Sequence, residues 1–191
     1  MLNNKQDLRI LKTQYLLTNA LFKLLKTNVF SHITVNDICT EAMVSRSAFY
    51  AHFEDKFSLL RFSLDTVTEK LKRKLEGKPL NEYIFTLLDH VKSNKQITRN
   101  IIKSDSSEEI REIILRPYVV SIEKAMIEQL GDDELILVPH RLAAFYHASG
   151  IISIIFLWVN QNLPYSVDEM AKYLVDMLPY AIRNITMSVD D

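Results

Sequence analysis

The stretch ITVNDICTEAMVSRSAFYAHFEDK, residues 33–56, decides the fold. Its pattern predicts two short helices separated by the three-residue turn 42–44. The first helix begins after Thr34, which is followed three residues later by an acid and so resembles a capping box. The second runs over about 45–52 with Ser45 as its N-cap. This spacing is typical of a helix-turn-helix, although a generic three-helix unit with solvated polar faces has the same pattern.

The neighbouring segments complete a three-helix unit. An apolar stripe predicts a helix over 8–27, and Asp55 is a candidate cap for a long helix that ends before Gly77. Ile38, Phe49 and Phe53 are expected to pack against the first helix. The remaining side chains of the second short helix then face solvent, on the side that would enter a DNA major groove.

Candidate DNA contacts follow from that orientation. Arg46 carries the long donor that can fork onto a guanine edge or hold a phosphate, and Ala48 suits a thymine methyl group. Phosphate contacts are expected on either side of the helix. Their candidates are a hydroxyl at a helix N-terminus, two neutral donors and one charge: Thr34, Tyr50, His52 and Lys56.

Composition excludes several classes of protein. The 191 residues include only 3 Gly and 5 Pro, too few for a fold with many tight turns, so an all-α protein is expected. One cysteine excludes an internal disulfide and a cysteine-based zinc site. The net charge of −1 is the sum of +2 over residues 1–60 and −3 over the rest. The N-terminus has no apolar run typical of a signal peptide, so a cytoplasmic protein is expected.

The second half is expected to be helical as well, with two domains in all. The helix-turn-helix domain is predicted over 1–54 and a regulatory and dimerisation domain over 55–191. Its further helices are predicted over 80–93, 95–103, 107–130, 139–160 and 166–187. Pro117 is expected to kink or divide the third of these.

The identity of the residues adds a family resemblance. The segment from Leu17 to Leu60 resembles the N-terminal domain of TetR-family transcriptional regulators. It contains the runs TVNDI (34–38), AMVS (42–45) and FYAHFEDKFSLL (49–60), of which the tyrosine-x-histidine-phenylalanine run followed by a lysine is the most specific. The resemblance implies an all-α homodimer with one DNA-binding head per subunit. It places the recognition helix at Ser45, Arg46, Ser47 and Ala48, and phosphate contacts at Tyr50, His52 and Lys56.

Three positions depart from the family pattern. Val29, Met43 and Ser47 stand where members usually have glycine. A left-handed backbone would be strained at Val29 and Met43, and Asn28 is a candidate to take over the first turn. The hydroxyl of Ser47 faces the DNA side, so its effect on base preference is open.

The C-terminal half contains a long apolar helix. Residues 145–178 resemble the last two helices of a TetR subgroup that includes regulators near dihydroxyacetone kinase. The overlapping stretch 142–159 carries no formal charge over 18 residues, close to the length of a membrane span. Polar and small residues interrupt this stretch, which favours a dimer-interface helix over a membrane helix. Together with the last helix it is expected to form a four-helix interface between two subunits.

Aromatic residues and a methionine in the second half are candidates for an effector pocket, and core packing explains them equally well. They are Tyr118, Met126, Phe145, Tyr146, Phe156 and Trp158. His140 and His147 lack a third ligand at helical spacing, so neither a metal nor a cofactor is expected. No glycine-flanked serine is present, and an enzyme is not expected.

The hypothesis that follows is a ligand-responsive repressor. A homodimer would read a near-palindromic operator in double-stranded DNA, and a small molecule of unknown identity would change its affinity. The alternative is an activator or co-regulator whose C-terminal domain binds a protein partner.

Overall fold

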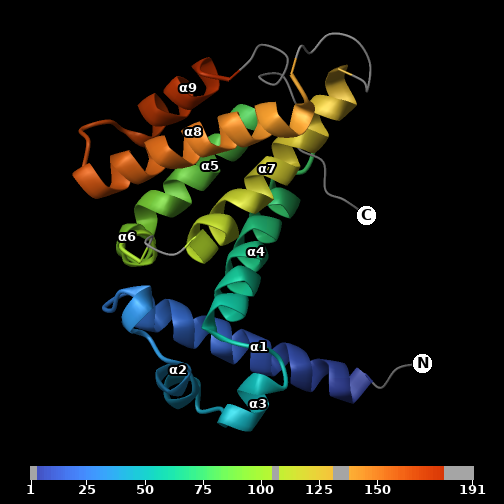
Figure 1. Ribbon diagram of the computed structural model, residues 1–191, viewed down its shortest axis with the longest axis vertical. Coiled ribbons are helices and arrows are strands. Elements are labelled where there is room, and N and C mark those ends of the chain that lie inside the picture. Colours follow the sequence, from blue (N-terminus) through green and yellow to red (C-terminus); the bar gives the residue numbers. More distant parts are fainter. Residues whose placement is uncertain (1–3, 105–107, 131–137, 179–191) are drawn as a thin grey trace. The chain divides into compact units, whose positions relative to one another are not determined.

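The computed structural model describes residues 4–104, 108–130 and 138–178 (Figure 1). Within these ranges the chain is helical and contains no strand, which confirms the predicted all-α fold. Its first half contains α1 (Asn4–Leu25), the short 3₁₀ helix η1 (Phe30–His32), α2 (Val35–Ala42), α3 (Arg46–Tyr50) and α4 (Lys56–Lys74). Its second half contains α5 (Leu80–Ser93), α6 (Lys95–Ile102), α7 (Glu108–Leu130), α8 (His140–Gln161) and α9 (Val167–Asp176).

The contacts divide the chain into two compact units. The first comprises the residues up to Leu64 together with Gln96–Arg111, and the second comprises Asp65–Lys95 and the described residues from Glu112 onward. This division differs from the boundary expected at 54/55, because α6 and the first turn of α7 group with the N-terminal helices. The chain therefore passes between the units inside α4, after the first residue of α6 and inside α7.

The first unit has a core built from four of the N-terminal helices and η1. Ile38, Phe49 and Phe53 are buried, as expected, at 0%, 0% and 6% exposure. From α1 the buried leucines are Leu17, Leu21 and Leu25, and α4 adds Leu59 and Leu60. The spacing of these residues at one turn intervals explains why α1 and α4 bury one face each.

The second unit has two principal core layers. In one, α9 packs on α5 and α8 through a cluster of apolar side chains: Ile84, Leu88, Ile155, Trp158, Val159, Met170, Ala171 and Leu174. In the other, α7 packs on α8 around the small residues Ala144 and Ala148, which are fully buried. Small residues at these positions allow the two helices to approach closely.

Helix ends follow local sequence signals. Gly77 has a φ of +72° and lies in the turn after α4, where a residue with a β-carbon would be strained.

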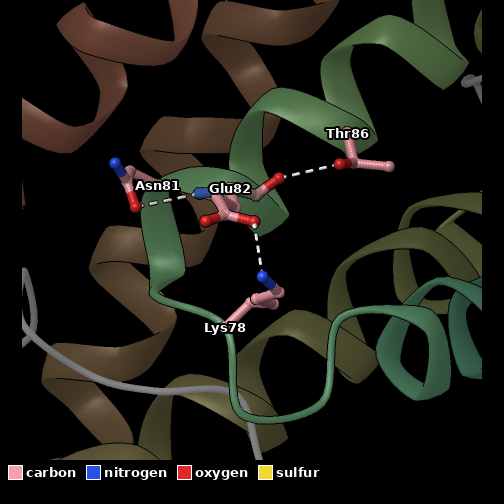
Figure 2. A network of polar contacts seen from close by, with 4 residues as sticks. All are labelled: Lys78, Asn81, Glu82 and Thr86. Atoms are coloured by element: carbon pink, nitrogen blue, oxygen red, sulfur yellow. Dashed lines mark hydrogen bonds and ion pairs between the residues drawn. The ribbon is translucent and has the colours of Figure 1, made fainter.

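At the start of α5, Asn81 accepts a hydrogen bond from the backbone N–H of Glu82 at 3.0 Å, and the Glu82 carboxylate lies 3.9 Å from Lys78 (Figure 2). α7 continues through Pro117 as one helix. α9 ends at Asp176, so the prediction of a helix at residues 177 and 178 is wrong. The rest of the predicted extension, to residue 187, lies outside the described residues.

Candidate nucleic-acid interface

Thr34 fixes the start of α2 through a reciprocal capping box. Its hydroxyl accepts a hydrogen bond from the backbone N–H of Asp37 at 3.2 Å, and Asp37 Oδ2 accepts from the Thr34 N–H at 2.9 Å. The Thr34 hydroxyl also donates to Asp37 Oδ2 at 2.6 Å. These bonds lower the pKa of Asp37 below its ordinary value, since they stabilise the carboxylate. The predicted cap is confirmed, and both groups are already engaged with each other.

The turn between α2 and α3 is a Schellman motif. The Val44 N–H donates to the Cys39 carbonyl at 3.0 Å, and the Met43 N–H donates to the Thr40 carbonyl at 3.2 Å. Met43 takes the left-handed conformation, with φ 55° and ψ 40°, as expected of a position where glycine is usual. Val29 does not, because its backbone is extended at φ −67° and ψ 138°. The expectation of a strained, left-handed backbone at Val29 is therefore wrong. Asn28, the candidate to take over this turn, does not have a positive φ either.

α3 presents a short polar face above a buried aromatic ring. The Ser45 hydroxyl accepts from the Ala48 N–H at 3.1 Å and lies 3.0 Å from the Ser47 hydroxyl. Arg46, Ser47 and Tyr50 are exposed, while Ala48 is half-buried. The helix is shorter than the predicted 45–52, because the chain turns after Tyr50.

Two side chains of this face lie together. The Arg46 guanidinium carbon is 6.0 Å from the centre of the Tyr50 ring, within the range of a cation–π contact. Both side chains are exposed and lie on one side of α3. His52, beyond the helix, is half-buried. The structure thus brings together Ser45, Arg46, Ser47 and Tyr50 as one exposed surface and keeps His52 at its margin.

Lys56 has partners that the sequence did not reveal. Its ammonium group donates to three backbone carbonyls around η1, those of Phe30 at 3.1 Å, Ser31 at 3.1 Å and Ile33 at 2.8 Å. It also lies 4.9 Å from the centre of the Phe30 ring. Burial lowers the pKa of Lys56. An ammonium group has three N–H donors, so a phosphate contact by Lys56 requires the exchange of at least one of these bonds.

α6 holds the same region from another side. The Asn100 side-chain amide, buried at 3% exposure, donates to the Leu25 carbonyl at 2.8 Å, at the end of α1. The Ser104 hydroxyl accepts from the backbone N–H of Ser31 at 2.9 Å. These contacts explain why α6 groups with the N-terminal helices. No sequence pattern identified them, because the partners are more than 70 residues apart.

The six candidate effector residues occupy different surroundings. Met126 and Trp158 are buried in the two core layers of the second unit, and the Trp158 indole N–H donates to the Tyr165 carbonyl at 3.1 Å. Tyr118 packs at the edge of the α7–α8 layer, where burial raises its pKa to about 12. Phe156 is half-buried. Phe145 and Tyr146 are exposed at 52% and 74%. Phe145 and Tyr146 line one and the same hollow.

That hollow is an apolar groove along α8 and the end of α9. Its volume is about 990 Å³, and its wall includes Phe145 and Tyr146 together with Leu142, Ser149 and Met177. The Ser149 hydroxyl oxygen is buried and has no hydrogen-bond partner among the described residues. α8 is long and apolar enough to cross a membrane by length and composition, a test that core helices of soluble proteins also pass. Its buried side chains pack on α5, α7 and α9.

Comparison with known proteins gives the family. A family model for the C-terminal region of TetR-type transcriptional regulators matches residues 78–180, more than half of the chain. The chain belongs to the TetR family of transcriptional regulators. Residues over 40% of the chain are 39% identical, across 77 positions, to the uncharacterized HTH-type transcriptional regulator YxbF of Bacillus subtilis (strain 168). The chain spans about a fifth, 19%, of the length of that relative.

Solved structures share the fold of this TetR-family chain. A TetR transcriptional regulator from Streptococcus agalactiae 2603V matches with a TM-score of 0.66 and 24% identity, over 90% of this chain and 96% of that one. The dihydroxyacetone kinase operon activator DhaS matches with a TM-score of 0.63 and 18% identity, over 86% and 93%. NalD of Pseudomonas aeruginosa, a secondary repressor of a multidrug efflux pump, matches with a TM-score of 0.60 and 20% identity, over 87% and 94%. At these identities the likeness shows the fold, and the DhaS-like subgroup stays a prediction.

TetR-family proteins are DNA-binding regulators that act as dimers and are generally not enzymes. In the described ranges, no three histidine, cysteine, aspartate or glutamate side chains are grouped so that they can hold a metal ion.

Proposed function

We propose that this TetR-family regulator is a cytoplasmic homodimeric repressor that binds a near-palindromic operator and responds to a small molecule. The observation that carries the proposal is the exposed face of α3, on which Arg46, Ser47 and Tyr50 stand beside the Ser45 cap while Phe49 anchors the helix in the core. In a helix-turn-helix this face lies in the major groove. The same geometry supports Ala48, Thr34 and His52 as secondary contacts.

Pairing of two subunits is supported by the α8–α9 groove. Four large apolar side chains around it are 52–74% exposed: Leu142, Phe145, Tyr146 and Met177. Their exposure to water is unfavourable in free energy, and burial against a second copy would remove that cost. The partnerless Ser149 hydroxyl lies in the same wall and would find a partner there. A dimer of this kind reads two half-sites about 34–36 Å apart, one helical turn of B-DNA.

The proposed response to an effector uses the helices that pass between the units. α6 and the start of α7 belong with the N-terminal helices, and Asn100 and Ser104 link α6 to α1 and η1. An effector that binds the second unit and prefers one position of α6 shifts the equilibrium between two half-site spacings. Tyr118 and Phe156 are the half-buried candidates to meet such a molecule.

The test is a titration of the purified chain with duplex DNA from upstream of its own gene. We expect salt-sensitive binding that is at least about a thousandfold tighter than binding to a random duplex, the lower end of the range of specific binders. Equal affinity for both duplexes at every salt concentration would refute a sequence-specific regulator.

The second candidate is an activator or co-regulator whose C-terminal domain binds a protein partner. Its support is the shared fold with DhaS, which is named as an operon activator. NalD, which is named as a repressor, has the same fold, so the fold is compatible with either sign of regulation. A reporter gene placed behind the upstream duplex that the chain binds distinguishes repression from activation. Expression that falls when the chain is deleted would favour the activator.

A further inference from the structure

Met43 is the most exposed large apolar side chain in the described part of the chain. Its side chain is 94% exposed, and its backbone has the left-handed conformation with φ 55°. A residue with a branched or long side chain is strained in that conformation, which glycine adopts freely. Met43 therefore combines two unfavourable features. Its side chain makes almost no apolar contact with the described residues that could compensate for either, since it is 94% exposed.

The second left-handed non-glycine residue among the described positions is different. Asn162, with φ 54°, ends α8. Asparagine tolerates this conformation better than other residues, and the Asn162 side-chain oxygen accepts a hydrogen bond from Lys95. Asn162 thus has both a permitted residue type and a contact. Met43 has neither. The Schellman motif accounts for the left-handed backbone at this position, but nothing in the described structure accounts for an exposed methionine there in place of glycine, so a functional reason is to be sought.

The position of Met43 points to that function. It lies two residues before Ser45, the N-cap of α3, and three before Arg46. The Schellman bonds from Val44 to Cys39 and from Met43 to Thr40 hold its backbone in place. In a helix-turn-helix the N-terminal residues of the second helix contact base edges. Met43 therefore lies directly before the part of α3 that a helix-turn-helix places closest to the bases, and its side chain is free to make a contact.

We propose that Met43 is a specificity-determining residue whose thioether side chain packs against the C5-methyl group of a thymine at the edge of the major groove. This inference rests on the proposed DNA-binding function. The thymine methyl is the apolar feature that the major groove offers, and methionine is a long, adaptable apolar side chain that can reach it. Contact with DNA would then bury the side chain that the free protein leaves in water.

The magnitude of the contact is that of one buried methyl group, roughly a fourfold change in affinity for each half-site. It should appear on the preferred sequence and be absent from random DNA. Met43→Gly removes the side chain and relieves the backbone, so its midpoint of thermal unfolding should rise while its affinity for the preferred duplex falls.

The experiment uses the full chain and the duplex that the wild-type protein selects from a random pool. Binding is measured for wild type, M43G, M43L and M43Q, on that duplex, on a random duplex and on copies in which each thymine is replaced by deoxyuridine, which lacks the methyl group. N162G is the matched control, a glycine at the other left-handed position. We expect M43G and M43Q to lose about fourfold per half-site on the selected duplex alone, and M43L and N162G to bind like wild type.

The deoxyuridine series assigns the base. One thymine per half-site should matter for wild type and M43L and should not matter for M43G and M43Q. If M43G binds the selected duplex as tightly as wild type, or loses affinity equally on random DNA, the proposal is wrong. An M43G midpoint below that of wild type would also overturn it, because Met43 would then stabilise the fold. If the wild-type chain selects no sequence at all, the DNA-binding function itself fails.

Discussion

Asn100 on α6 donates its side-chain amide to the backbone carbonyl of Leu25 at the end of α1, at 2.8 Å, although 75 residues separate the two. The last carbonyls of a helix have no partner within the helix, and a buried one is costly to leave unpaired. Asn100 satisfies such a carbonyl, and Gln96 in turn donates to Asn100 Oδ1 at 3.1 Å. The bond therefore ties the position of α6 to the end of the helix that supports α2 and α3.

Removal of this bond should destabilise the first unit. In Asn100→Ala the Leu25 carbonyl stays buried without a donor, and we expect a loss of about 1–3 kcal/mol in the free energy of unfolding, measured by urea denaturation. Asn100→Asp should cost more, because a carboxylate cannot donate and repels the carbonyl. The exposed neighbour Lys103 supplies the control, and K103A should unfold like wild type. Equal stability of N100A and K103A would show that the bond is replaced by water.

Lys56 is expected to act through the protein rather than through phosphate. In Lys56→Gln the carbonyls of Phe30, Ser31 and Ile33 lose a charged donor, so the unfolding free energy should fall by about 1–3 kcal/mol. Binding to all DNA sequences should weaken alike, with an unchanged slope of log affinity against log salt concentration. A slope that is shallower by about one per subunit would instead assign Lys56 to a phosphate.

Arg46 should carry base discrimination. We expect Arg46→Ala to reduce the ratio of specific to random binding by about 1–3 kcal/mol, because its guanidinium is the long donor at the start of α3. Lys172→Ala on α9 changes the net charge by the same amount and is exposed, so it serves as the control. Competition binding with selected and random duplexes measures the ratio. If both variants weaken binding equally on both duplexes, Arg46 contributes only charge.

The sequence predicts what is local and periodic in this fold. Both helix caps, at Thr34 and Ser45, and the burial of Phe49 follow from side-chain chemistry within four residues, and the structure confirms them. The left-handed backbone at Met43 follows from the usual glycine at that place. In contrast, polar pairs such as Ser104 with Ser31 leave no periodic signal, because one hydrogen bond between distant segments needs only one residue on each side. The backbone carbonyls that bind Lys56 were missed for the same reason. The predicted phosphate contact was based on the charge and position of Lys56 and not on the hydrogen bonds that its ammonium group makes within the protein.

Subunit pairing through the α8–α9 groove should be sensitive to a charge in its wall. Phe145 is half in water, so Phe145→Glu should leave the monomer folded, while burial of its carboxylate against a second copy would be costly. We expect monomers in sedimentation at concentrations where wild type forms dimers, and a loss of preference for paired half-sites. Val120, on α7, is similarly exposed and lies outside the residues of this groove, so V120E is the control. Dimers of F145E would place the interface elsewhere.

The same interface should weaken as the pH falls. His147 lies in the wall of the groove, and burial lowers its pKa from the ordinary value near 6.5, since desolvation disfavours the charged imidazolium. Pairing would bury it further and lower the pKa again. The dimer therefore binds fewer protons than the separated subunits between the two pKa values. Its stability is complete above the pKa of the separated subunits, which lies below 6.5, and declines as the pH falls through that value. Sedimentation from pH 7.5 to 5.5 should show a rising dissociation constant for wild type and a flatter one for His147→Gln. His90, whose pKa is also lowered by burial, is present in both proteins and cancels from the comparison. Identical pH profiles for the two proteins would remove His147 from the interface.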